Sequence, residues 1–150
     1  MHLDGIQPTD ISKVWDEVAP LLAPAVARTE FTLESVREQL DEGKQQLWVG
    51  HDQERILLAM TTQIDVTPHL GRRACKLLYM GGRRFFKEAI GFFANILEWA
   101  KSEGCTEVIT WTRPAIYKKA LKPLGFNFVE RTSNGAFLVF MDTGVEWERR

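Results

Sequence analysis

Hydrophobic residues near the start of the chain recur at helical spacing, after a short stretch over residues 1–6 that is typical of an edge strand. The spacing predicts a first helix that begins after an N-cap at Thr9-Asp10. Its apolar positions are Ile11, Val14, Trp15, Val18, Leu21 and Leu22. Pro20 and Pro24 should kink or end this helix, because proline lacks the backbone N–H that the helical ladder uses.

A second helix is expected to begin at Thr32 and to end at Gly43. Ser35 stands three residues after Thr32, at the place where a capping box carries Glu or Gln. The spacing then changes to that of strands. Residues 46–50 and 56–66 are separated by a polar turn, and the second run is long, apolar and rich in branched side chains, so they predict a hairpin.

The strongest helix signal lies in the middle of the chain. A third strand over residues 74–80 ends at Gly81-Gly82, and the helix follows it. Its apolar face consists of Phe86, Ala89, Ile90, Phe93, Leu97 and Ala100, widened by Phe85, Phe92 and Trp99. Gly104 ends the helix, and residues 106–112 form the next strand.

The last third of the chain predicts a short helix and two strands. Pro114 starts a helix over residues 115–124. Strands over residues 126–131 and 136–141 flank a hairpin turn at Ser133-Asn134-Gly135, in which Asn and Gly accept positive φ. The strands before and after the long helix, over residues 74–80 and 106–112, are joined by that helix, and strands connected in this way usually run parallel to one another. The chain therefore predicts an α/β (α+β) fold with a mixed sheet and one parallel step around the long helix.

Composition is that of a folded single-domain protein. The 150 residues are 45% hydrophobic and 26% charged, with a formal net charge of −1, which argues against a dedicated nucleic-acid binder. We expect a domain over residues 1–142 and a charged tail over residues 143–150, either a loose end or a docking segment. With no apolar run of membrane-spanning length and no secretory pattern at the start, a cytoplasmic protein is expected.

Cysteine and histidine do not form a metal-binding pattern. Cys75 and Cys105 are far apart and neither belongs to a CxxC pair, while His2, His51 and His69 are scattered. We therefore expect no metal site and two reduced, mostly buried thiols.

Two passages resemble parts of the GNAT acyltransferases. Residues 98–106, EWAKSEGCT, resemble the passage in which that family's long helix closes with Ala-x-x-x-Gly-Cys before a strand. Residues 117–126, YKKALKPLGF, resemble the family's short helix followed by Gly-Phe and a strand. The order of elements matches the same fold over essentially the whole chain. The resemblance implies a mostly antiparallel sheet of six to seven strands flanked by about four helices.

Two other stretches resemble divergent GNAT-like proteins of tailed bacteriophages. These are the Gly-Gly strand end at Tyr79-Met80-Gly81-Gly82 and the Arg-Pro-Ala step within residues 111–115. The family resemblance implies an N-acyltransferase that moves an acetyl group from acetyl-CoA to an amine of a small molecule, protein or modified base. The phage resemblance implies an alternative: a catalytically inactive, GNAT-shaped virion, morphogenesis or interaction protein with a phage structural partner.

The candidate cofactor-binding segment is Met80, Gly81, Gly82, Arg83 and Arg84. The family's loop reads Gln/Arg-x-x-Gly-x-Gly/Ala, and this chain departs from it. A helix N-terminus offers free N–H groups to a pyrophosphate, and glycines let phosphate approach the backbone. Two arginines there oppose the helix dipole by about 0.3–1 kcal/mol each, a cost that a bound anion would reverse. The competing interpretation is a tight glycine turn beside solvated arginines.

Acyl transfer needs a base for the amine proton and a proton donor to the leaving thiolate. The family's donor is often a Tyr four residues before the Gly of Gly-Phe, where this chain has Leu121. Tyr117, one helical turn earlier, and Tyr79, at the end of the third strand, are the candidate catalytic residues, with packing as the competing role. Asp65 and Glu107 are candidate bases, unless they are simply exposed strand carboxylates.

A group of basic residues lies close together in the sequence: Arg72, Arg73, Lys76, Arg83, Arg84 and Lys87. This basic cluster suits the 3′-phosphate of CoA or a nucleic-acid backbone, and the competing interpretation is a solvated face. A third hypothesis follows from the nucleic-acid reading, namely a small inhibitor of a host nucleic-acid enzyme.

Overall fold

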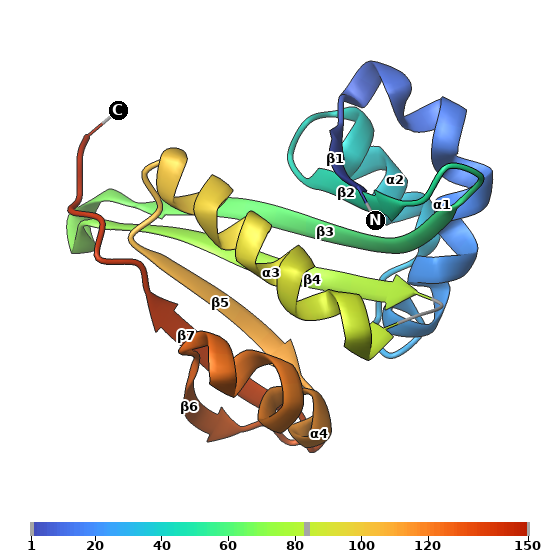
Figure 1. Ribbon diagram of the computed structural model, residues 1–150. Helices are drawn as coiled ribbons and strands as arrows, with labels where there is room; N and C mark the ends of the chain where they lie inside the picture. Colours follow the sequence, from blue (N-terminus) through green and yellow to red (C-terminus); the bar gives the residue numbers. More distant parts are fainter. Residues whose placement is uncertain (1, 83–84, 150) are drawn as a thin grey trace. The chain divides into compact units, whose positions relative to one another are not determined.

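The computed structural model describes residues 2–82 and 85–149, with side chains described for residues 2–82 and 91–149. Seven strands form one sheet in the order β1-β2-β3-β4-β5-β7-β6 (Figure 1). The strands are β1 (His2–Ile6), β2 (Gln46–His51), β3 (Ile56–Thr67), β4 (Arg72–Gly82), β5 (Glu107–Thr112), β6 (Asn127–Arg131) and β7 (Phe137–Asp142). The helices are α1 (Ile11–Val26), α2 (Leu33–Asp41), α3 (Phe85–Ser102) and α4 (Pro114–Ile116), with short turns η1 (Pro8–Asp10), η2 (Pro68–Leu70), η3 (Tyr117–Leu121) and η4 (Lys122–Leu124).

Strand pairing confirms the predicted mixed sheet and its parallel step. The pairs β1–β2, β2–β3, β5–β7 and β6–β7 are antiparallel. β4 and β5, the strands before and after α3, are parallel from Ala74 opposite Glu107 to Leu77 opposite Thr110. β7 lies between β5 and β6, so the last strand in sequence is an inner strand and β6 is at the edge of the sheet.

The chain divides into two compact units. Unit 1 comprises Met1–Gln63 and Leu78–Phe85, and unit 2 comprises Ile64–Leu77 and Phe86–Arg150. Strands β3 and β4 therefore contribute one part to each unit.

Helix α1 continues through both of its prolines. The sequence predicted that Pro20 and Pro24 kink or end the helix, and they do not end it, since it runs on to Val26. Both prolines are exposed, and the opposite face is apolar and buried, so packing holds the helix despite the two missing hydrogen bonds. The N-cap is Asp10, within the predicted pair, but the chain enters α1 through η1 and the Asp10 side chain makes no capping bond.

Helix α2 begins with a capping box in which Ser35 takes the usual place of Glu. The Ser35 N–H donates to Thr32 Oγ1 at 3.1 Å, and the Thr32 N–H donates to Ser35 Oγ at 3.1 Å. Two backbone donors that the helix leaves unsatisfied therefore find partners. The predicted start at Thr32 is confirmed, and Gly43 just beyond the helix has a positive φ of 74°.

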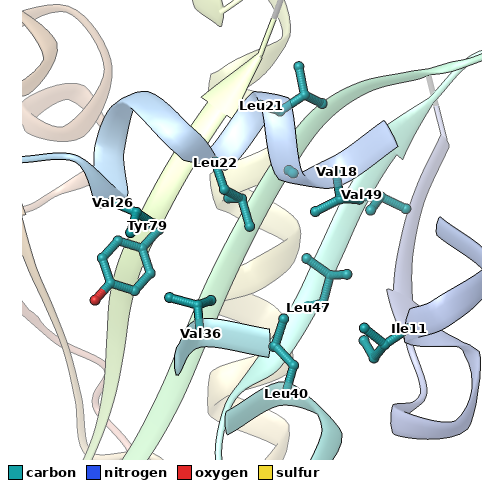
Figure 2. Close-up of a cluster of buried hydrophobic side chains, with 11 residues drawn as sticks. Ile11, Val18, Leu21, Leu22, Val26, Val36, Leu40, Leu47, Val49 and Tyr79 are labelled. Atoms are coloured by element: carbon teal, nitrogen blue, oxygen red, sulfur yellow. The ribbon is translucent and has the colours of Figure 1, made fainter. Parts of the chain in front are cut away.

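The core of unit 1 lies where its two helices meet its strands, and Figure 2 shows the side chains that form it. Val18 and Leu22 of α1 are fully buried beside Leu40 of α2. The cluster consists of Ile11, Val18, Leu21, Leu22, Val26, Val36, Leu40, Leu47, Val49, Ala59 and Tyr79. The end of β4 thus belongs to the same core as the two N-terminal helices, through Tyr79.

Gly81 and Gly82 are the last two residues of strand β4, so they do not form the tight turn of the competing interpretation. Neither has positive φ, so backbone conformation does not require glycine here. Space does: a Cβ on Gly81 would lie 1.8 Å from the carbonyl oxygen of Leu21, and one on Gly82 would lie 2.0 Å from Leu58 Cδ2 and 2.7 Å from the Leu57 carbonyl. The glycines therefore allow β4 to approach α1 and β3 closely.

Unit 2 is built around the parallel step. Phe92, Phe93 and Ile96 of α3 are buried, as are Val108 of β5 and Val139 of β7. The predicted short helix is irregular, because α4, a π-helical turn (η3) and a 3₁₀ turn (η4) follow one another before Gly125 ends the segment. In the hairpin turn, Gly135 takes positive φ as predicted, whereas Asn134 does not and instead accepts a hydrogen bond from the Ala136 N–H at 3.3 Å.

The tail makes specific contacts within unit 2. Thr143 donates from its backbone N–H to the Thr106 carbonyl at 3.1 Å and from its hydroxyl to the Cys105 carbonyl at 2.6 Å. Further along, the Trp147 side chain lies against Gly71, where an added Cβ would be 3.5 Å from Trp147 Cγ. Residues 143–147 therefore pack on the rest of unit 2. Within the described residues, no helix has both the length and the apolar character needed to cross a membrane.

We predict that Gly81→Ala destabilises the protein by about 1–3 kcal/mol, because the new methyl group meets a backbone carbonyl that cannot rotate away. The measurement is the free energy of unfolding in urea. Gly91→Ala in α3 is the matched control: apart from its neighbours and the helix's own backbone, no described atom lies within 4 Å of its added Cβ, so it should stabilise the helix by about 0.5–1 kcal/mol. Equal stability of the two variants would contradict the close approach.

An ion pair joins the edge strand β1 to β2. His51 Nε2 pairs with Asp4 Oδ2, and His51 Nδ1 lies 3.1 Å from the Asp52 carbonyl oxygen. The hydrogen bond to Asp4, followed by the bond to the Asp52 carbonyl, raises the pKa of His51 above its ordinary value. The folded state therefore holds the proton more tightly than the unfolded chain does.

Stability should accordingly depend on the charge of His51. The contribution of the pair is fully present below about pH 6.5 and is lost as pH rises through the raised pKa of the folded state. We expect the urea midpoint of the wild type to fall over this range, and that of Asp4→Asn to fall less. His69→Gln, which changes an exposed histidine in η2, is the control and should keep the wild-type slope. A wild-type slope in Asp4→Asn would rule out this pair as the cause.

Candidate active site

The candidate cofactor-binding segment begins at the end of β4. Met80 is half-buried, and Gly81 and Gly82 pack against unit 1 as described above. Arg83 and Arg84 lie outside the described residues. α3 then begins at Phe85 and runs for 18 residues, so a long helix N-terminus follows the strand after two residues. The N-terminus of α3 is suited to an anion. The space left by the missing side chains of Gly81 and Gly82 is occupied by the Leu21 carbonyl and by Leu58, and so is not open to a ligand.

Tyr79 belongs to the core of unit 1, and Figure 2 shows its ring beside Val26 of α1. The residue is 8% exposed, and its backbone N–H donates to Thr61 Oγ1 at 3.3 Å. Burial raises the pKa of the Tyr79 phenol, and a hydrogen bond with Thr29 opposes part of that shift. The hydroxyl is therefore protonated at neutral pH, which is the form that donates a proton.

Tyr117 lies on the π-helical turn η3 of unit 2. Its hydroxyl donates to the Phe126 carbonyl at 3.3 Å, and its ring meets Phe137 edge to face with centroids 5.9 Å apart. Leu121, at the position where the family often has Tyr, is 1% exposed and is part of the core. The structure thus gives Tyr117 a tethering role between η3 and the start of β6, and leaves its predicted catalytic role as a prediction.

The two candidate bases both have cationic partners within unit 2. Asp65 of β3 pairs with Lys76 of β4. Glu107 of β5 accepts a hydrogen bond from Arg72 Nε at 2.6 Å and is only 9% exposed. Glu107 is therefore not the exposed strand carboxylate of the competing interpretation. Each of the two carboxylates is therefore held by a cation from a neighbouring strand.

The same ion pairs change the interpretation of the basic cluster. Arg72 and Lys76 are committed to carboxylates on neighbouring strands. Arg73 lies between them in sequence, and its Nε is buried without a hydrogen-bond partner among the described residues. Arg83 and Arg84 are outside the description, as is the side chain of Lys87. Within the described residues, the cluster is therefore not a continuous basic face.

Two polar residues that the sequence did not single out have defined roles. Thr110 Oγ1 donates to the Leu77 carbonyl at 2.9 Å, at the last described β4–β5 pair. Thr29, in the loop between α1 and α2, is the partner of the Tyr79 phenol. A threonine in a strand or loop carries no pattern that marks such a bond, so only the fold reveals these partners.

Both cysteines are buried, and within the described residues neither belongs to a disulfide. Burial, followed by the neighbouring Cys105 thiol, raises the pKa of Cys75 far above its ordinary value, so this thiol is not activated as a nucleophile. Over the part of the chain that the structure describes, no group of three or more His, Cys, Asp or Glu side chains is arranged to hold a metal ion.

Comparison with solved structures shows the fold of the GNAT acetyltransferases. The aminoglycoside 6′-acetyltransferase type Ii superposes with a TM-score of 0.72 at 14% identity, covering 95% of this chain and 97% of that one. The ribosomal-protein-S18-alanine N-acetyltransferase from Escherichia coli gives 0.66 at 12% identity, covering 99% and 96%. The PaiA N-acetyltransferase from Thermoplasma acidophilum, in complex with coenzyme A, gives 0.59 at 10% identity, covering 95% and 99%.

The similarity is one of fold and not of sequence. No sequence-family model matches the chain, and no curated protein matches it either. At 10–14% identity these structures establish the architecture, which supports more than one function. The predicted sheet of six to seven strands flanked by about four helices is confirmed.

We predict that Tyr117→Phe lowers the free energy of unfolding by about 0.5–1.5 kcal/mol, the usual contribution of one hydrogen bond. Tyr117→Leu should lower it by about 0.5–1.5 kcal/mol more, because the edge-to-face contact with Phe137 is also lost. Urea denaturation of the three proteins measures both steps. Unchanged stability in Tyr117→Phe would mean that the tether contributes nothing and that the hydroxyl is available for chemistry.

Proposed function

We propose that this protein is an N-acyltransferase that transfers an acetyl group from acetyl-CoA to an amine. The observation that carries the proposal is the GNAT acetyltransferase fold over nearly the whole chain, including a long helix that starts directly after β4 and leads to the parallel strand β5. One structure with this fold is a complex with coenzyme A, which supports acetyl-CoA as the co-substrate.

The start of α3 is the part of the chain suited to the phosphates of acetyl-CoA. A helix N-terminus has free backbone N–H groups and a partial positive charge, and Arg83 and Arg84 immediately precede this one in sequence. Arginine donates paired hydrogen bonds to phosphate oxygens. Bound in this way, acetyl-CoA supplies an activated thioester, while the protein positions it and supplies the proton transfers.

The proton transfers are assigned to the two tyrosines and to solvent or a carboxylate. The amine loses a proton as it attacks, and the leaving thiolate gains one. Tyr79 and Tyr117 are the predicted donors, and burial, which raises the pKa of Tyr79, leaves its phenol protonated but also makes it a weaker acid. The candidate carboxylates for removing the amine proton, Asp65 and Glu107, are each held in an ion pair.

A second candidate is a GNAT-shaped protein without catalysis, such as a phage virion or morphogenesis component. Specific observations favour it: Leu121 is buried where the family's tyrosine often stands, and the Tyr117 hydroxyl is used by the Phe126 carbonyl. The packing of Gly81 and Gly82 also explains these glycines without any ligand. This candidate predicts no saturable binding of acetyl-CoA.

Thermal unfolding with acetyl-CoA, compared with CoA and ATP, distinguishes the two. A ligand that binds only the native state adds about 2.7 kcal/mol at a hundred times its Kd. For a domain of this size the corresponding rise in Tm is roughly 5–10 °C. We expect a saturable rise with acetyl-CoA that is lost when Arg83→Ala is combined with Arg84→Ala.

The matched control combines Arg28→Ala with Arg55→Ala, which removes the same charge from two exposed positions of unit 1. It should keep the full rise in Tm. No shift up to millimolar acetyl-CoA would refute the acyltransferase proposal and favour the interaction protein. An equal loss in both double variants would mean that net charge, and not the start of α3, attracts the ligand.

A further inference from the structure

A hollow on one face of the unit 2 sheet has no role in the proposed acyl transfer. It has a volume of about 270 Å³ and lies among the start of β4, the start of β5, the end of β7 and the tail. The residues that define its chemistry are Arg72, Glu107, Phe140, Asp142, Val145 and Trp147. All of them belong to unit 2.

The hollow contains two carboxylates that face one another across strands. Glu107 of β5 is directly opposite Asp142 of β7, so both side chains stand on the same face of the sheet. Like charges in this arrangement repel, and a cation between them relieves the repulsion. Arg72 does not lie between them: it reaches Glu107 from β4, on the other side of β5, with its Nε and Nη2 at 2.6 and 2.5 Å from Glu107 Oε1.

The described hydrogen bonds use one oxygen of each carboxylate. Glu107 accepts through Oε1, and Asp142 accepts the Gly144 N–H through Oδ1 at 2.8 Å. The hollow therefore has one cation for two carboxylates. An added ammonium group would balance the charge, whereas an added anion would meet two carboxylates and an arginine that is already paired.

The remaining walls are aromatic and apolar. The Trp147 ring lies against Gly71 at one side of the hollow, and aromatic faces attract cations. On the same face of the sheet, Phe140 of β7 lies opposite Ile109 of β5. Two residues further along each strand, Leu138 lies opposite Trp111, which is 45% exposed. An apolar strip thus continues along the sheet from the carboxylates. Such walls favour an organic cation over a hydrated metal ion, which needs oxygen ligands on several sides.

We infer that this hollow binds an organic cation, with a primary ammonium group at Glu107 and Asp142 against Trp147 and a hydrocarbon chain along Phe140 and Ile109. Binding at this place does not depend on acyl transfer. The shared property of the ligands is a charged amine on an apolar chain, and the site rejects the neutral alcohol and the carboxylate of the same length.

The test is a titration of the full chain with n-hexylamine near neutral pH, where the amine is charged, without any acyl donor. Hexanol and hexanoate are titrated in parallel. Binding is followed by NMR through the indole N–H of Trp147, which is assigned by comparison with Trp147→Phe. We expect saturable binding of hexylammonium alone. Saturation by hexanol to the same extent would reduce the site to an apolar strip and overturn the proposal, as would no saturation with the amine.

Matched acidic variants locate the charge. Asp142→Asn keeps an oxygen for the Gly144 N–H and should weaken hexylammonium binding about five-fold, the effect of losing one partly exposed ion pair. Glu146→Gln removes the same charge from an exposed tail residue that does not line the hollow, and should change binding less than about two-fold. Equal weakening by both variants would show diffuse attraction and overturn the site. Because acetyl-CoA is absent throughout, failure here leaves the acyltransferase test unaffected.

Discussion

The backbone of β4 constrains both units of this protein. In its second half, Gly81 approaches the Leu21 carbonyl so closely that no side chain fits between strand and helix. In its first half, Ala74 to Leu77 pair in parallel with β5. Each half of the strand is therefore held within its own unit. In sequence, α3 follows the end of β4 after two residues, and its first turn has backbone N–H groups without helical partners.

This constraint changes what the Gly-Gly pair means. A pair of glycines before a helix is typical of a phosphate-binding turn, and that is how it reads in sequence. Here both glycines are in extended backbone and their missing side chains make room for Leu21 and Leu58. The argument for an anion at α3 therefore rests on the helix start and on the arginines before it, and no longer on the glycines.

Ion pairing across strands has a similar effect on the charged residues of unit 2. In sequence, Lys76 and Arg72 look like parts of a basic surface. In the structure, Arg72 pairs with Glu107 of β5 and Lys76 pairs with Asp65 of β3. Asp142 of β7 lies opposite Glu107 of β5, and Arg72, from β4 on the other side of β5, pairs with Glu107 only. The charged residues lining the hollow of unit 2 are therefore one arginine and two acids, whereas the sequence indicated a basic cluster here.

Local patterns in the sequence were sufficient for most of the fold. Periodicity located the long helix and the hairpins, and the composition of residues 98–106 and 117–126 indicated the family whose fold the structure has. These signals are local, because helix and strand spacing depend on near neighbours. Where packing competes with a local rule, the sequence alone did not decide the outcome: Pro20 and Pro24 could have ended α1, and the helix continues through both.

The candidate site was only partly predictable for the same reason. Tyr79, Tyr117 and Glu107 were identified by residue type, but their surroundings come from distant segments: Thr29 for the first, Phe126 and Phe137 for the second, and Arg72 for the third. Sequence by itself determined which elements form and in what order. Tertiary structure decided which glycines are needed for space and which charges are neutralised, because both depend on contacts between residues far apart along the chain.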